Sequence, residues 1–171
     1  MRRGAPAQSD AWPQRAAWQV LGVVLILLLS PIILGLLLVY FVYAAALHAA
    51  IWAWWLPRGR DVLFVYSDSP VWQAHVEREI LPHIERRAVV LNWSRRARWP
   101  VTLATIAFHH FGGDRSFNPM AVVFRPARRA RVFRFWQAFR DAKHGNTRPL
   151  RRMEDEFLAL LGVDRPAHPA A

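Results

Sequence analysis

The sequence predicts a small α/β domain that follows an N-terminal membrane-spanning helix, and three observations lead to this class. First, no charged residue occurs between Arg15 and Arg58, and most of that stretch is aliphatic or aromatic. A charge at the centre of a bilayer costs at least a few kcal/mol, so this pattern is typical of a membrane segment. Second, short β-branched runs alternate with amphipathic helical patterns after Arg60. Third, a length of 171 residues allows one anchor and one small domain.

The charge-free stretch is longer than a simple membrane span requires. A span needs about 20 residues, whereas the whole stretch as one helix would reach roughly 60 Å against a hydrocarbon core of about 30 Å. Trp18 and the aromatic group at 40–43 are separated by about 33 Å of helix, close to the distance between the two membrane interfaces. We therefore expect residues 18–43 to span the membrane with a kink at Pro31, and residues 44–57 to lie along the interface.

The expected interfacial segment carries aromatic and basic residues. Leu47, Ile51 and Trp55 share one helical face at i, i+4 spacing, as in helices that lie on a membrane surface. The residues expected at this surface are Trp52, Trp54, Trp55, Arg58 and Arg60. A helical hairpin that turns near Pro31 is the alternative. Because arginines flank both ends of the stretch, the positive-inside rule does not decide the orientation; we expect an uncleaved anchor and a cytoplasmic domain.

Four strands and three helices are expected in the domain. Apolar runs rich in β-branched and aromatic residues predict strands at 62–66, 88–93, 120–124 and 131–136. Helical spacing of apolar residues predicts helices at 70–84, 101–111 and 149–161. Ser69 is the expected cap of the first helix, Pro82 its expected kink, and Gly162 the expected stop of the last. The connection 125–130 is short enough to make the last two strands a hairpin.

The resulting order, β-α-β-α-β-β-α, resembles the thioredoxin fold. The stretch from Phe117 to Phe124 looks like the part of that family in which a cis-proline, here Pro119, immediately precedes the third core strand. The segment from Ser67 to Pro70 lies where the family carries its CxxC motif. The resemblance covers about residues 60–162 and implies a thioredoxin-like domain behind the transmembrane helix.

Two departures from the family limit what the resemblance implies. The chain has no cysteine, so thiol–disulfide chemistry does not carry over. Pro82 also lies about a turn farther from the helix start than the family's usual proline. A flavodoxin-like or other three-layer sheet is the alternative, although the expected hairpin argues against a fully parallel sheet. The expected division of the chain is a basic tail at 1–17, the anchor at 18–57, the domain at 60–162 and a flexible tail at 163–171.

This topology predicts that three polar segments meet at one edge of the sheet, because the start of the third strand lies near the end of the fourth. The candidate ligand-binding residues are Ser67, Asp68, Ser69, Arg115, Asn118, Pro119, Arg140, Lys143 and His144. The N–H groups at the start of the first helix, together with these cations, suit a phosphate or carboxylate. The structural alternative is that Ser69 only caps a helix and that the acidic residues pair with arginines.

Composition narrows the function classes. Without cysteine there are no disulfides, no thiol catalysis, no iron–sulfur cluster and no thiolate zinc site. His109 and His110 point about 100° apart on a helix, and no Gly-rich phosphate loop or nucleophile elbow is present, so we expect no metal and no cofactor. The net charge of +11 is almost entirely arginine, which is typical of a G+C-rich, bacterial-type genome or of a surface for anionic lipid. Nucleic acid is not expected as a partner, since the arginines at 125–131 are better explained as solvated residues that protect an exposed hairpin end.

The sequence thus favours a membrane-anchored, non-redox domain whose partners are the lipid bilayer and either a partner protein or an anionic small ligand. The alternative is an enzyme that acts on a phosphorylated or carboxylated substrate at the edge formed by 67–70, 118–119 and Lys143.

Overall fold

The computed structural model describes residues 11–112 and 118–163, with side chains from Trp18 onwards. The chain forms two units that divide between Ala45 and Ala46. The first unit contains most of helix α1 (Ala11–Trp54), and the second contains the last turns of α1 and all of the strands.

Helix α1 runs without interruption through the boundary at which we expected a separate interfacial helix. The stretch Trp18–Arg58 is long and apolar enough to cross a membrane. Pro31 lies inside the helix and has no N–H to donate to the carbonyl of Leu27. The Ser30 Oγ donates to that carbonyl instead, at 3.1 Å. A side-chain hydroxyl of this kind is a common way to satisfy a backbone group freed by proline in a membrane helix.

The last turns of α1 belong to the core of the domain. Leu47, Ile51 and Trp55 share a face, as expected, but they are only 5%, 0% and 5% exposed. They pack with Leu63, Val65 and other residues of the sheet, and the Trp55 ring meets that of Phe124 edge-on at 5.7 Å. This corrects the prediction that the face lies on the membrane, because the same apolar stripe covers a sheet that would otherwise be exposed.

The other residues expected at the membrane surface remain more accessible. Trp54 is 61% exposed, Trp52 is half-buried, and Arg58 and Arg60 are exposed. The Arg58 Nη1 donates to the carbonyl of Trp54 at 2.7 Å, so a cation caps the end of α1. After the short 3-10 turn η1 (Leu56–Arg58), Gly59 adopts a φ of 69°, which reverses the chain toward the first strand.

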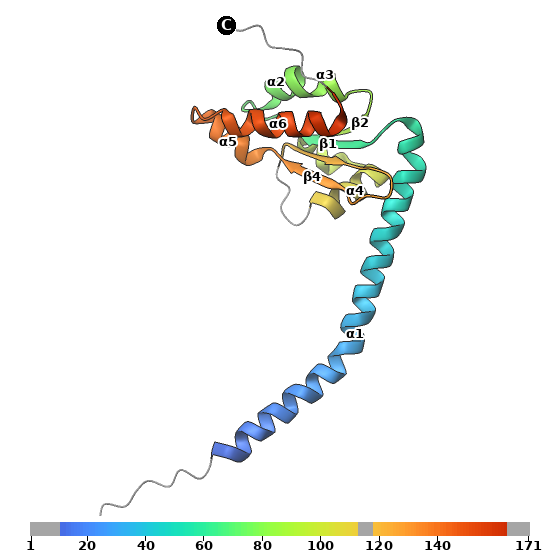
Figure 1. Cartoon of the computed structure of the whole chain (residues 1–171), viewed down its shortest axis with the longest axis vertical. Coiled ribbons are helices and arrows are strands. Elements are labelled where there is room, and N and C mark those ends of the chain that lie inside the picture. The colour runs from blue at the N-terminus through green and yellow to red at the C-terminus, as the bar shows by residue number, and fades with distance from the viewer. Residues whose placement is uncertain (1–10, 113–117, 164–171) are drawn as a thin grey trace, which may run out of the picture. The chain divides into compact units, whose positions relative to one another are not determined.

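The sheet is mixed and has the order β2-β1-β3-β4 (Figure 1). Its strands are β1 (Val62–Tyr66), β2 (Ala88–Asn92), β3 (Met120–Val123) and β4 (Arg131–Arg134). Strands β1 and β2 are parallel, β3 is antiparallel to β1, and β3 and β4 form the expected hairpin. The mixed sheet excludes the fully parallel alternative. The Asn118–Pro119 peptide bond, just before β3, is cis.

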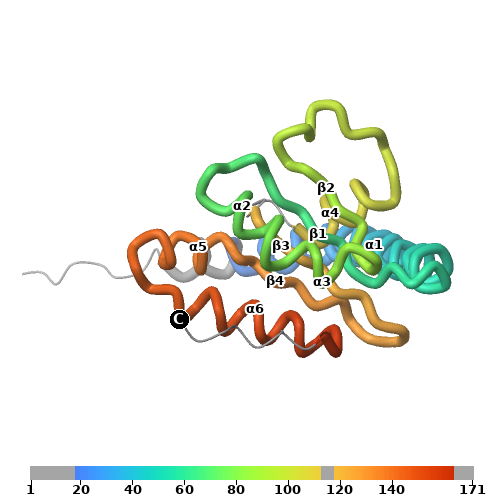
Figure 2. Tube along the Cα trace, turned by 90° about the horizontal axis from the view of Figure 1, so that it is seen from above, coloured from blue at the N-terminus to red at the C-terminus, as the bar shows by residue number. Residues whose placement is uncertain are grey.

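Helices cover both faces of this sheet (Figures 1 and 2). One face packs against the segments that follow β1 and β4. After β1 these are α2 (Gln73–His75), the π-helical turn η2 (Val76–Ile80) and α3 (Leu81–Ile84), and after β4 they are α5 (Trp136–Lys143) and α6 (Arg148–Leu161). The other face packs against α4 (Leu103–Gly112) and the end of α1. Alternate residues of β1 serve the two cores, Val62 and Phe64 on the first side and Leu63 and Val65 on the second. This continuous burial explains why β1 has no polar residue before Tyr66.

Two predicted elements differ from the structure. The first helix begins at Gln73 rather than Pro70, because the carbonyl of Ser69 accepts the N–H groups of Trp72 and Gln73 and the intervening residues form a turn. It becomes π-helical just before Pro82, whose ring excludes the normal hydrogen bond of the preceding turn. The fourth strand ends at Arg134, since Phe135 and Trp136 begin helix α5, which we did not predict.

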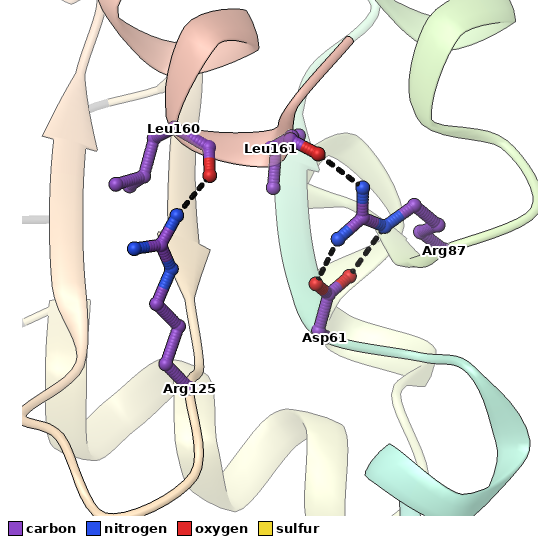
Figure 3. Close-up of polar contacts among 5 residues, drawn as sticks. All are labelled: Asp61, Arg87, Arg125, Leu160 and Leu161. Atoms are coloured by element: carbon purple, nitrogen blue, oxygen red, sulfur yellow. Dashed lines mark hydrogen bonds and ion pairs between the residues drawn. The ribbon is translucent and has the colours of Figure 1, made fainter.

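Two arginines hold the C-terminal end of α6 (Figure 3). The Arg87 Nη1 donates to the carbonyl of Leu161 at 2.6 Å, and the same guanidinium forms a bidentate ion pair with Asp61 at the start of β1. Arg125, just after β3, donates to the carbonyl of Leu160. The last carbonyls of a helix lack internal partners and carry partial negative charge, so both contacts are favourable. Gly162, with a φ of 66°, ends α6 as predicted.

The burial of the α1 end leads to a first prediction. Replacing Ile51 with Ala in the full chain should lower the free energy of unfolding of the domain by about 2–5 kcal/mol, because a fully buried aliphatic side chain leaves a cavity. Ile33→Ala is the matched control, since Ile33 is in the same helix and 54% exposed. Chemical unfolding in detergent, followed by near-ultraviolet circular dichroism, measures the difference. Equal effects of the two substitutions would contradict the packing of α1 against the sheet.

Candidate functional site

The loop predicted to bind a ligand is hydrogen-bonded to the end of β2 and to the turn that follows it. The Asn92 Nδ2 donates to the Asp68 Oδ1 at 2.6 Å, and the backbone N–H of Asp68 donates to the Ser94 Oγ at 3.0 Å. The Trp72 Nε1 donates to the Ser67 Oγ at 3.2 Å, and the Ser69 Oγ accepts the N–H of Val71 at 3.4 Å. These polar groups therefore serve the local structure of the loop.

The remaining predicted residues are dispersed. Asn118 and Pro119 are buried at the start of β3, and the Asn118 Oδ1 has no hydrogen-bond partner among the described residues. The Arg140 guanidinium lies over the ring of Trp136, 5.0 Å from its centroid, and His144 is exposed. Arg115 lies outside the described residues.

Lys143 is the predicted residue that reaches a cavity. Helices α5 and α6 lie side by side (Figure 2), and with the start of the first helical segment they line an open cavity of about 710 Å³. We call it the helical cavity; its lining comprises Pro70, Val71, His75, Glu79, Phe139, Ala142, Lys143, Thr147, Leu150, Arg151 and Glu154. The volume is within the range of small-molecule sites. The structure thus brings Lys143 and Pro70 to one site, while Ser67, Asp68 and Ser69 do not line it.

A buried carboxylate and a histidine form the polar centre of the helical cavity. The His75 Nε2 lies 2.6 Å from the Glu154 Oε1, and the two side chains are 33% and 2% exposed. In the tautomer with the proton on Nε2, the imidazole donates to the carboxylate. The ring of Phe139 meets the imidazole edge-on at 5.3 Å and fixes its orientation. Such a pair, half open to the cavity, can bind a polar group or move a proton.

Sequence reasoning missed Glu154, although α6 carried a signal. Its buried residues are Leu150, Glu154, Phe157, Leu158 and Leu161, which is the i, i+4, i+7, i+8, i+11 pattern of one helical face. An acidic residue in the middle of such a stripe requires a buried partner, because an isolated charge is costly in a core. The partner, His75, is 79 residues away in sequence, so no local spacing connects the two.

The rim of the helical cavity carries cations. Lys143 and Arg151 are both exposed and line the cavity, together with the half-buried Glu79. Thr147, which also lines it, precedes α6 without making a side-chain cap, so the first N–H groups of that helix have no capping side chain. Pro70, Val71 and Leu150 supply apolar surface. The arrangement therefore suits a ligand with an apolar body and an anionic group.

Other titratable groups lie away from this cavity. Burial raises the pKa of Tyr66, with a further contribution from the carboxylate of Glu77, to which its hydroxyl donates. Burial also lowers the pKa of His110, with a smaller contribution from His48. In the described part of the chain, no three potential metal ligands lie together.

Comparison of the chain with protein-family models, with curated proteins and with solved structures gives no match. The arrangement of the strands and the contents of the cavities are therefore the features from which a function is inferred.

The pairing of His75 with Glu154 leads to a second prediction. His75→Ala should destabilise the full chain near neutral pH by about 2–3 kcal/mol, because it removes a donor from beside a buried carboxylate. His75→Gln, whose amide can still donate, should recover much of this loss. His83→Ala, on the neighbouring turn, is the control and should cost under about 1 kcal/mol. Chemical unfolding in detergent measures all three; a Gln variant as unstable as the Ala variant would contradict the hydrogen bond.

Proposed function

We propose that this chain is a single-pass membrane protein whose cytoplasmic, non-redox domain binds a small anionic ligand in the helical cavity. The observation that carries the proposal is the cavity of about 710 Å³, whose lining combines the exposed cations Lys143 and Arg151 with apolar residues such as Val71 and Leu150. A ligand-sized cavity that combines apolar surface with a few converging polar groups is the usual form of a binding site. The anionic group can equally belong to a protein partner, such as the carboxylate of a peptide.

The domain is proposed to be thioredoxin-like. The sheet order β2-β1-β3-β4, with parallel β1 and β2 and an antiparallel β3–β4 hairpin, supports this topology. The placement of helices on both faces supports it as well, and the cis peptide bond before Pro119 agrees with the resemblance. Because the chain has no cysteine, the domain acts by binding rather than by thiol exchange.

Membrane attachment is proposed from the composition of α1. The stretch Trp18–Arg58 includes a strongly apolar window that is not buried inside the structure, so lipid is the environment that suits it. A helix of this kind holds the domain at one membrane and raises the local concentration of membrane-bound ligands.

A second candidate function is catalysis, and the His75–Glu154 pair is the observation that favours it. A histidine oriented by a buried carboxylate can act as a general base or acid toward a substrate in the same cavity. The structure places Ser67 and Ser69 in other hydrogen bonds, so in this candidate the nucleophile is water or a group on the substrate. The substrate class is the same as for binding: a molecule with a phosphate or carboxylate group.

The third prediction tests ligand binding. Phenyl phosphate and benzoate should bind the full chain in detergent, whereas uncharged benzyl alcohol should not. Changing both Lys143 and Arg151 to Ala should weaken binding roughly tenfold, because each exposed cation contributes up to about 1 kcal/mol. Isothermal titration calorimetry gives the affinities. Arg152→Ala is the matched control, since Arg152 follows Arg151 on α6 but does not line the cavity.

Equal binding of benzyl alcohol, or an equal loss in the Arg152 variant, would contradict an anion site in the helical cavity. Hydrolysis of 4-nitrophenyl phosphate or acetate separates the two candidate functions. Turnover that disappears in Glu154→Gln while phenyl phosphate still binds would favour the enzyme. Binding of phenyl phosphate without turnover favours the binding protein.

A further inference from the structure

A second binding surface lies on the opposite side of the sheet from the helical cavity. Two neighbouring cavities, of about 380 and 260 Å³, share Trp99, Pro100 and Thr105 in their linings. We call the pair the tryptophan groove. Its first part is lined by Trp54, Trp55 and Arg60 as well as by residues of β2 and α4, and its second part by Trp93 and Arg96. All of these residues belong to the second unit of the chain.

The aromatic walls of the tryptophan groove are held in place by the fold. The Trp99 Nε1 donates to the carbonyl of Asn92 at 3.1 Å. Its ring meets those of Trp93 and Phe108 edge-on, at 5.9 and 5.5 Å between centroids. Trp55 is 5% exposed and forms part of the core beneath the groove. The surface is therefore preorganised, which lowers the entropic cost of binding.

The charges of the tryptophan groove are all positive. Neither of its linings, drawn from the described residues, includes Asp or Glu, whereas Arg60 and Arg96 are exposed within them. The Arg96 guanidinium lies 4.7 Å from the centroid of the Trp93 ring, and Arg95 and Arg98 are exposed on the same 3-10 helix, η3 (Trp93–Arg98). Figure 2 shows the segment between β2 and α4, which contains η3, reaching out from the sheet. An apolar floor with a cationic rim complements a molecule that has an apolar chain and an anionic head.

The position of the groove residues along the chain favours a lipid as the bound molecule. Trp54 and Trp55 lie at the end of the apolar stretch, and Arg60 follows it. Arg58, over the ring of Trp54 at 4.2 Å, is the last residue of the candidate span. Tryptophan and arginine at the end of a membrane helix are the residues that contact lipid headgroups. Val101, which lines the second cavity, is 89% exposed, an apolar side chain that water does not favour.

We propose that the tryptophan groove binds an anionic phospholipid of the bilayer, with part of an acyl chain between Trp54, Trp99 and Leu103 and the phosphate at Arg60 and Arg96. The inference uses the membrane location proposed above but not the ligand of the helical cavity. Such a groove would make the domain selective for anionic lipids, since a zwitterionic lipid offers the two arginines no net negative charge.

The fourth prediction concerns lipid selectivity. The full chain, purified in a neutral detergent, should bind phosphatidylglycerol at least tenfold more tightly than phosphatidylcholine. Changing both Arg60 and Arg96 to Gln should reduce the affinity for phosphatidylglycerol about 30-fold, because each arginine near an anionic lipid contributes roughly fivefold. Changing both to Lys should retain most of it. Native mass spectrometry of a lipid titration gives the affinities.

Two pairs of substitutions control for the loss of positive charge. Arg128→Gln with Arg129→Gln removes two exposed arginines from the β3–β4 turn, and Lys143→Ala with Arg151→Ala removes two cations from the helical cavity. Both pairs should leave phosphatidylglycerol binding unchanged. An equal loss in either pair, no preference over phosphatidylcholine, or equally tight binding of soluble glycerol 1-phosphate would overturn the proposal. A negative result in this experiment would not bear on the ligand proposed for the helical cavity, because the phenyl phosphate titration uses a different probe and different residues.

Discussion

The burial of Leu47, Ile51 and Trp55 against the sheet is the interaction on which the rest of the domain depends. Helix α4 is only ten residues long, and it shares the task of covering one face of a four-stranded sheet with the end of α1. Full burial of a large apolar side chain contributes about 1.5–3 kcal/mol, so three of them contribute an amount comparable to the whole net stability of a small domain. The last turns of α1 are therefore a structural element of the α/β fold.

Local patterns predicted most of this fold because each strand coincides with a short run of β-branched and aromatic residues. All four strands were predicted, since runs such as Val62–Tyr66 and Met120–Val123 are apolar throughout and buried on both faces. Helix α5 was missed because Phe135 and Trp136 prolong the apolar run of β4. That run masks the helical i, i+3, i+4 spacing of the core residues Phe135, Ala138 and Phe139. The end of α1 was assigned to the membrane because a stripe that fits an interface fits a sheet equally well. Likewise, local patterns could not show which polar groups meet in space: Asp68 bonds to Asn92, and Glu154 pairs with a histidine distant in sequence.

Some of the arginines form contacts within the fold, and others face solvent beside cavities. Arg87 and Arg125 each donate to a carbonyl at the end of α6, and Arg131 pairs with Glu156. Arg60, Arg96 and Arg151 line cavities on the two sides of the sheet. The high positive charge of the composition therefore has at least two structural roles: some arginines form contacts within the fold, and others line the cavities from which ligand binding is proposed. The two cavity systems share no residue, so one can change without rebuilding the other.

The position of β3 between β1 and β4 has a consequence for the biosynthesis of the chain. Strand β1 pairs with β3 across a gap of about 60 residues, from Val62 to Val123, which a ribosome takes on the order of 3–12 s to synthesise. During this interval helix α1 has already been synthesised, while the first strand has only β2 available, on one side. The partner of Arg87 at Leu161 is synthesised later still. The central strand of the nascent domain therefore stays half paired for this time, and an unpaired strand edge is a site at which chains aggregate.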